Sequence, residues 1–290
     1  MQKLIGTGLR TIGAVSPRLG GRLTFALWRR PLARGRVRDS ELDVHTAARV
    51  ETVAGVLTYA WGDGARPVLL VHGWRSRASR YAGFITRLLE LGYSPVSYDA
   101  PGHGDSPGPI TSILGHQRII RALEERHGPF EGVIGHSLGV LFALYSVKEG
   151  VAAKRLVMVS GVADFGYLAD SFCRMLGLGP KVNRRLRREI ERGYFDGDHT
   201  IWDRFSVATG KAPLLVVHND EDDVVDPEQA RVLLLNYGEQ AHFHPTTGLG
   251  HGRILQDPAV IAEAVAFLQD QESLQDDQDS DVAEGLDLSA

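Results

Sequence analysis

The chain has 290 residues, of which 43% are hydrophobic and 23% charged, a composition that excludes a wholly disordered, collagen-like or transmembrane chain. The formal net charge of −4 gives no overall attraction to nucleic acid, so we expect no nucleic-acid partner. The single cysteine, Cys173, excludes an intrachain disulfide and argues against a cysteine-based metal site.

The first 45 residues are strongly basic, and we predict that they form a helical arm. Between Met1 and Arg38 the sequence has nine basic side chains and no acidic one. Five apolar residues fall roughly on one helical face between the arginines: Leu9, Ile12, Leu19, Leu23 and Leu27. Several glycines weaken this helix. We expect the arm to pack on the rest of the protein. A basic amphipathic membrane anchor is the second interpretation, and an organellar transit peptide is the third.

The sequence lacks the patterns of a secretory signal and of a membrane span. Arg10 and Arg18 interrupt the apolar run that a secretory signal needs, and no segment approaches the roughly 20 apolar residues that cross a bilayer. We therefore expect a cytoplasmic protein, held peripherally at a membrane if the arm is an anchor. From Asp270 onward there are eight acidic and no basic side chains, and residues 271–290 are predicted to be a disordered acidic tail.

Residues 46–160 and 211–270 alternate short β-like runs with helical stretches, which favours a mostly parallel sheet flanked by helices. We predict an antiparallel edge strand at 50–60 and further strands at 67–71, 95–98, 132–135, 155–159, 213–217 and 241–244. Helices are predicted at 79–90, 112–127, 138–148, 227–236 and 258–269.

This alternation stops between Gly161 and Gly210, where the chain becomes rich in aromatic residues. Val182, Leu186 and Ile190 recur every four residues within a basic run, which predicts an amphipathic helix. We expect residues 161–210 to form a small helical cap inserted before the strand at 213–217.

The central motif is Gly135-His136-Ser137-Leu138-Gly139, at the junction between a predicted strand and a predicted helix. A nucleophilic serine needs such a junction, because the sharp turn lifts its hydroxyl clear of the sheet. The glycines remove Cβ atoms that would collide across the turn, and the amino end of the helix favours developing negative charge. Ser137 is therefore the candidate nucleophile.

A serine nucleophile requires a base, and the base requires an orienting carboxylate. The best base is His251, in the glycine-flanked loop between the last predicted strand and helix. The loop after the strand at 213–217 offers four acids, among which composition cannot choose: Asp220, Glu221, Asp222 and Asp223. For the oxyanion, the backbone N–H groups of Leu138 and Trp74 are the candidate donors.

Five motifs resemble those of the α/β-hydrolase superfamily, and of its capped bacterial esterase and lipase-like members in particular. They are VLLVHGW (68–74), YDAPGHGDS (98–106), GHSLG (135–139), LLVVHNDEDDVV (214–225) and GLGHG (248–252). The resemblance implies an α/β-hydrolase fold, with the cap at its usual position before the acid-bearing strand. Relatives carry a glycine where this chain has Asn219, and counting three residues onward selects Asp222, with Asp223 or Asp220 as fallbacks. The HGGG oxyanion motif of another branch is absent, which argues against esters of bulky tertiary alcohols.

We therefore predict a serine hydrolase that cleaves small-molecule carboxylic esters through Ser137, His251 and Asp222, without cofactor or metal. The residues expected to contact the substrate are His136, Phe165, Phe172 and Trp202. The same site suits a thioesterase, an acyltransferase or a C–C hydrolase, and the basic arm suits a membrane-associated lipid hydrolase. A ligand-binding receptor built on this fold is a further alternative. The oligomeric state stays open.

Overall fold

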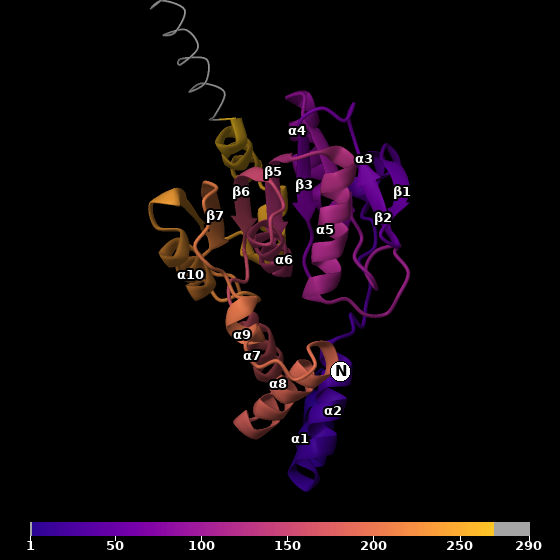
Figure 1. Ribbon diagram of the computed structural model, residues 1–290, viewed down its shortest axis with the longest axis vertical. Coiled ribbons are helices and arrows are strands. Elements are labelled where there is room, and N and C mark those ends of the chain that lie inside the picture. Colours follow the sequence, from indigo (N-terminus) through magenta and orange to yellow (C-terminus); the bar gives the residue numbers. More distant parts are fainter. Residues whose placement is uncertain (1, 270–290) are drawn as a thin grey trace, which may run out of the picture.

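The computed structural model of the chain describes residues 2–269 (Figure 1), so the predicted acidic tail lies outside the described residues. An eight-stranded sheet forms the centre, in the order β1-β2-β4-β3-β5-β6-β7-β8. The strands from β4 onward in this order are parallel, and β1 and β2 are antiparallel to their neighbours. Their bounds are β1 Arg49–Val53, β2 Val56–Ala60, β3 Pro67–Val71, β4 Ser94–Tyr98, β5 Phe130–His136, β6 Ala153–Val159, β7 Leu214–Asn219 and β8 Ala241–Thr246. The mostly parallel sheet is therefore confirmed.

The prediction of one edge strand over residues 50–60 is wrong, because the segment folds back as the hairpin β1–β2. Ala54 and Gly55 both have positive φ, +50° and +80°, and form the tight turn of this hairpin. Cross-strand partners share a face, and Val53 pairs with Val56, so the alternation of side chains changes phase at this turn. The prediction of a single strand overlooked this change of phase.

Helices cover both faces of the sheet, as expected. On one face α5 (Ile113–His127), α6 (Leu138–Lys148) and α10 (Glu228–Tyr237) pack over side chains such as Leu69 and Val71. On the other face α4 (Ala82–Glu90) and the helix at residues 258–269 pack over Val68 and Leu70. Shorter helices complete the core: α3 (Leu42–Thr46), α11 (Gly250–Arg253), and the 3₁₀ turns Asp39–Glu41, Ala78–Tyr81, Gly238–Gln240 and Ile254–Gln256.

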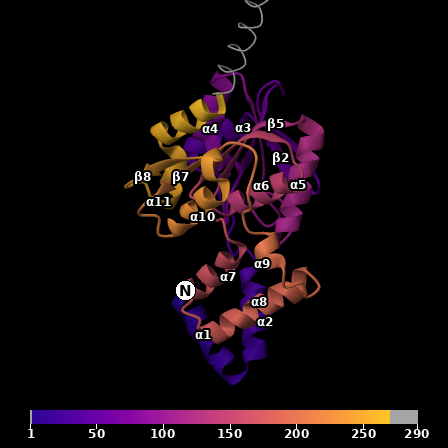
Figure 2. The same cartoon turned by 60° about the vertical axis from the view of Figure 1, so that its left-hand side comes forward.

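Three helices follow β6 and precede β7, in the segment predicted to be a cap: α7 (Phe165–Met175), α8 (Pro180–Tyr194) and α9 (Ile201–Arg204). Val182, Leu186 and Ile190 form the buried face of α8, as the four-residue spacing predicts. The basic arm forms two helices, α1 (Gln2–Val15) and α2 (Pro17–Trp28), separated at Ser16, which caps α2 by accepting from the Leu19 N–H. The arm lies beside α7 and α8 at one end of the sheet (Figure 2).

Only part of the apolar face predicted for the arm is buried in the structure. Leu9 is buried, but Leu19 and Leu23 are exposed, and α2 instead buries Gly20, Gly21 and Thr24. These glycines lie at helix crossings: a Cβ on Gly20 would stand 2.7 Å from the Gly13 Cα, and one on Gly21 would stand 2.8 Å from the Arg185 Cβ. The glycines thus allow α1, α2 and α8 to approach closely, which a search for apolar periodicity does not detect.

Arg34, in the part of the arm that follows α2, ties the arm to the core. Its guanidinium donates hydrogen bonds to the carbonyl oxygens of Gly104, Ser106 and Gly108. These acceptors belong to the turn that follows β4. The arm is therefore fixed against both the cap and the core.

Candidate active site

Ser137 lies on the sharp turn between β5 and α6, with φ of 56° and ψ of −125°. A non-glycine residue at positive φ is strained and is held by its surroundings. Both flanking glycines are required by packing: a Cβ on Gly135 would stand 2.9 Å from the Val140 Cα, and one on Gly139 would stand 2.1 Å from the Val71 carbonyl oxygen. The local sequence therefore creates the turn that presents the Ser137 hydroxyl.

A hydrogen-bonded series links Ser137 to His251 and Asp222. The His251 Nε2 lies 3.0 Å from the Ser137 Oγ, and its Nδ1 lies 2.8 Å from the Asp222 Oδ2. Since the ionised carboxylate only accepts, Nδ1 carries the imidazole proton and Nε2 is free to accept from the serine hydroxyl. His251 lies in the short helix α11 rather than in an irregular loop.

The structure distinguishes among the four acids of the loop after β7. Asp222 is buried, whereas Asp220, Glu221 and Asp223 are exposed. The Asp222 Oδ1 accepts the backbone N–H groups of Val224 and Val225, each at 2.9 Å. Burial alone raises the pKa of this carboxyl, but the hydrogen bond and positive charge of His251, with those two N–H groups, lower the pKa to about 2. Asp222 is therefore a fixed negative charge at neutral pH.

Two further side chains position the segment that carries His251. The Asn219 Oδ1 accepts the Leu249 N–H at 3.0 Å, so Asn219 anchors the turn before His251. The His136 Nε2 lies 2.9 Å from the His251 carbonyl oxygen and must be its donor. Asn219 was noted in the sequence only as a departure from the family motif, and this contact was not predicted.

The two N–H groups predicted to hold an oxyanion are available in the structure. Within residues 2–269 the backbone N–H groups of Leu138 and Trp74 donate to no acceptor. The Gly73 Cα packs against Ser137, since a Cβ there would stand 2.7 Å from the Ser137 Cβ. The His72 Nε2 accepts the Ala100 N–H, so the proton of this imidazole is on Nδ1, which donates to the Gly73 carbonyl at 2.8 Å. This bond fixes the peptide unit that bears the Trp74 N–H. These contacts of His72 were not predicted from the sequence.

A cavity of about 830 Å³ opens over Ser137, between the core, the cap and the arm. Phe165 and Phe172, two of the four residues expected to contact the substrate, line it. The expectation that His136 and Trp202 contact the substrate is not supported, because neither lines the cavity. His136 lies beneath His251, and the Trp202 indole N–H donates to the Glu191 side chain at 2.8 Å. The arm, which was not predicted to reach the site, contributes six lining residues: Ile5, Leu27, Trp28, Arg29, Arg30 and Leu32.

Buried histidines around the site predict an acid-sensitive fold. Burial, with nearby histidines, lowers the pKa of His103 and of His136 to about 3 each. An unfolded histidine titrates near pH 6.5, so below that pH the unfolded chain binds protons that the folded protein does not. The free energy of unfolding should then fall by about 1.4 kcal/mol per pH unit for each histidine between pH 6.5 and 3.

Urea titrations between pH 7 and pH 4 measure this slope, and His103→Gln should reduce it. A free energy of unfolding that is constant over this range would contradict the expectation. If His103→Gln left the slope unchanged, the contribution assigned to His103 would be contradicted.

Comparison with known proteins agrees with this architecture. The sequence model of the alpha/beta hydrolase family matches residues 68–264. No curated protein matches the sequence as a relative. Among solved structures, the esterase RhEst1 from Rhodococcus sp. ECU1013 shares 18% identity over 77% of this chain and 98% of its own, with a TM-score of 0.54. A monoacylglycerol lipase from Paleococcus ferrophilus shares 24% over 73% and 98%, with a TM-score of 0.57. A putative lipase from Acinetobacter baumannii AYE shares 18% over 83% and 99%, with a TM-score of 0.59.

Proposed function

Because the chain belongs to the alpha/beta hydrolase family, we propose that it is a serine hydrolase that cleaves carboxylic esters. The observation that carries the proposal is the hydrogen-bonded series Ser137–His251–Asp222, with its hydroxyl at the floor of a cavity lined by apolar side chains. A hydroxyl, an imidazole and a buried carboxylate in this order are the groups that acyl transfer requires.

In the proposed mechanism the Ser137 Oγ attacks the ester carbonyl carbon while the His251 Nε2 takes the hydroxyl proton. Asp222 stabilises the imidazolium that forms, and the N–H groups of Leu138 and Trp74 hold the negative carbonyl oxygen. His251 then gives its proton to the leaving alcohol, which leaves an acyl group on Ser137. Water, deprotonated by His251, attacks this acyl-enzyme and releases the carboxylic acid.

The apolar lining favours an acyl chain without charge, of short or medium length. Phe165, Leu168 and Phe172 supply one wall of the cavity from the cap. A series of 4-nitrophenyl esters from acetate to dodecanoate should show kcat/KM rising from acetate to a medium chain. A preference for acids with polar or charged chains would contradict an apolar acyl pocket.

A second element of the proposal is contact of the arm with an anionic membrane. In the part of the chain that the structure describes, no helix has the length and hydrophobicity needed to span a bilayer. Around the turn between α1 and α2, however, Val15 is 85%, Leu19 49% and Leu23 38% exposed, with Arg18 and Arg22 beside them. Exposed apolar side chains among arginines are the pattern of a helix that lies at the surface of an acidic bilayer.

Sedimentation with vesicles tests this contact without deleting the arm, which lines the cavity. The protein should bind vesicles that contain phosphatidylglycerol more tightly than vesicles of phosphatidylcholine alone, and Leu19→Asp with Leu23→Asp should weaken this binding. Leu235→Asp, at a more exposed leucine on α10 of the core, serves as the control. Equal binding to both vesicles, or an equal loss in the control, would contradict the proposed contact.

A further inference from the structure

The part of the cavity formed by the arm is basic. Arg29 and Arg30 follow directly after α2 and line the cavity together with Tyr194, the last residue of α8. Phe25 holds two of these groups near each other: the Arg29 guanidinium lies 5.2 Å from the centre of its ring, and the Tyr194 ring meets it edge-on at 5.5 Å. Two helices far apart in the sequence thus bring cations and a phenol to one place.

Two donors of this cluster are buried without a partner in the described part of the chain. The Arg29 Nε and the Tyr194 hydroxyl are buried without a hydrogen bond, and so is the hydroxyl of Thr111, another residue of the cavity lining. No acidic side chain among residues 2–269 forms an ion pair with Arg29 or Arg30. Buried donors without acceptors are costly, and a ligand with several acceptor oxygens removes that cost.

Tyr194 acts here as a donor. Burial raises its pKa to about 12, although the positive charges of Arg29 and Arg30 oppose the shift. Its hydroxyl therefore keeps its proton at neutral pH. Three donor side chains around one end of a cavity suit a group that carries negative charge on more than one oxygen.

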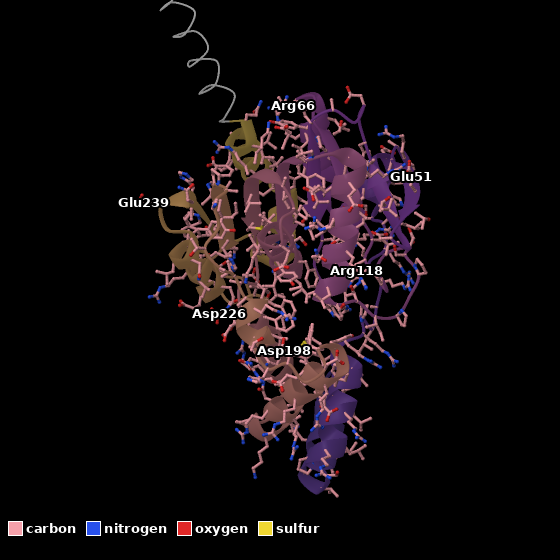
Figure 3. The ribbon with its side chains drawn as sticks, in the orientation of Figure 1. Glu51, Arg66, Arg118, Asp198, Asp226 and Glu239 are labelled. Atoms are coloured by element: carbon pink, nitrogen blue, oxygen red, sulfur yellow. The ribbon has the colours of Figure 1, made fainter. Side chains whose placement is uncertain are left out.

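The acids of the cavity lie elsewhere. The three carboxylates in its lining, Asp222, Asp223 and Asp226, all belong to the loop between β7 and α10, and Asp226 lies where the core meets the cap (Figure 3). These carboxylates repel an anion. Leu27, Trp28 and Leu168 supply apolar surface of the same cavity near the arginines, and the Trp28 indole N–H donates to the Leu168 carbonyl. Two other arginines of the lining, Arg75 and Arg174, are exposed. The arm differs from them because it places its cations beside the buried, unpaired Arg29 Nε and Tyr194 hydroxyl, which favours an anionic group there.

We propose that the substrate is an ester of an apolar acyl chain with a phosphorylated alcohol, of the monoacylglycerol phosphate type, and that Arg29, Arg30 and Tyr194 bind its phosphate. This inference rests on the proposed function and names its substrate class. A phosphate monoester offers three acceptor oxygens and nearly two negative charges, which match the two guanidinium groups and the phenol. The acyl chain occupies the apolar lining, and its ester carbonyl lies at Ser137.

A pair of non-hydrolysable ligands that differ only in the phosphate tests the subsite. Isothermal titration should show 1-O-decylglycerol 3-phosphate binding at least about tenfold more tightly than 1-O-decylglycerol. Arg29→Gln and Arg30→Gln should each remove most of this difference. Arg118→Gln, which removes a charge from the exposed surface of α5 (Figure 3), should keep it. Arg30 is itself exposed, so its replacement tests the charge without disturbing a buried contact. Equal affinity for the two ligands, or the same loss in Arg118→Gln, would overturn the subsite.

Kinetics with 1-decanoylglycerol and its 3-phosphate test the phosphate subsite separately from the proposed esterase function. The phosphate should raise kcat/KM at least about tenfold in the wild type, and the gain should disappear in Arg29→Gln. Hydrolysis of 1-decanoylglycerol that depends on Ser137, without a gain from the phosphate, would reject the subsite and leave the esterase function intact. Tight binding of the phosphate ligand without hydrolysis of either ester would reject the esterase function and retain the subsite.

Discussion

Ser137→Ala is expected to lower kcat for a 4-nitrophenyl ester by a factor of about 10⁴ or more, as losses of the nucleophile do in serine hydrolases. The variant removes the atom that forms the acyl-enzyme, and no other hydroxyl lies within hydrogen-bond distance of the His251 Nε2 in the described residues. Since alanine is smaller than serine, it fits the same turn, although it also takes on the strain of a positive φ. Steady-state kinetics with purified wild type and variant measure the effect.

The matched control for this experiment is Ser40→Ala, at an exposed position in the 3₁₀ turn Asp39–Glu41. It should keep wild-type kcat. Circular dichroism spectra and thermal midpoints of both variants establish that each remains folded. An unchanged rate in folded Ser137→Ala would remove Ser137 from the mechanism.

Asp222→Asn should lower kcat by about 10⁴, because an amide in place of the carboxylate can hold His251 in the wrong tautomer. The amide oxygen still accepts the N–H groups of Val224 and Val225, so the loop is expected to stay in place. The amide nitrogen then faces the His251 Nδ1 as a donor, and the imidazole proton moves to Nε2, where it blocks acceptance from Ser137. Steady-state kinetics at pH 8 measure the loss.

Asp223→Asn and Asp220→Asn are the matched controls, since both acids lie in the same loop but are exposed. Both should retain activity within a few fold of the wild type. The assignment would fail if Asp223→Asn lost the activity and Asp222→Asn kept it. The low pKa of Asp222 also predicts how folding stability depends on pH. The ionised carboxylate stabilises the fold above about pH 3.8, and this contribution is lost as the pH falls through about 2.

The elements that the sequence predicted well are those fixed by local chemistry. Helix α6 begins at Leu138 and ends at Lys148 as predicted, because the turn at Ser137 starts it and Gly150, at φ of +98°, follows its end. Strands buried on both faces appear in the sequence as short apolar runs, which is why β3 and β7 were placed correctly. The choice of Asp222 among four acids came from the family motif, and burial in the structure supports the same residue.

What the sequence did not reveal depends on contacts between distant segments. Trp28 and Arg29 precede Ser137 by more than a hundred residues, and no local pattern indicates that they line the same space. Trp202 has the size and chemistry of a pocket residue, but α9 turns it toward Glu191 and Arg187. The glycines of the arm reduced the expectation of a helix, although they are the residues that allow its two helices to pack.

Covalent labelling by a fluorophosphonate, which reacts with an activated serine hydroxyl, tests directly whether Ser137, His251 and Asp222 act as one unit. Intact-mass analysis of the full chain should show one adduct, and peptide mass spectrometry should place it on Ser137. Neither Ser137→Ala nor His251→Ala should be labelled at an appreciable rate. A wild type that stays unlabelled, or an adduct on another residue that persists in Ser137→Ala, would contradict the claim that Ser137, His251 and Asp222 act together as a catalytic unit.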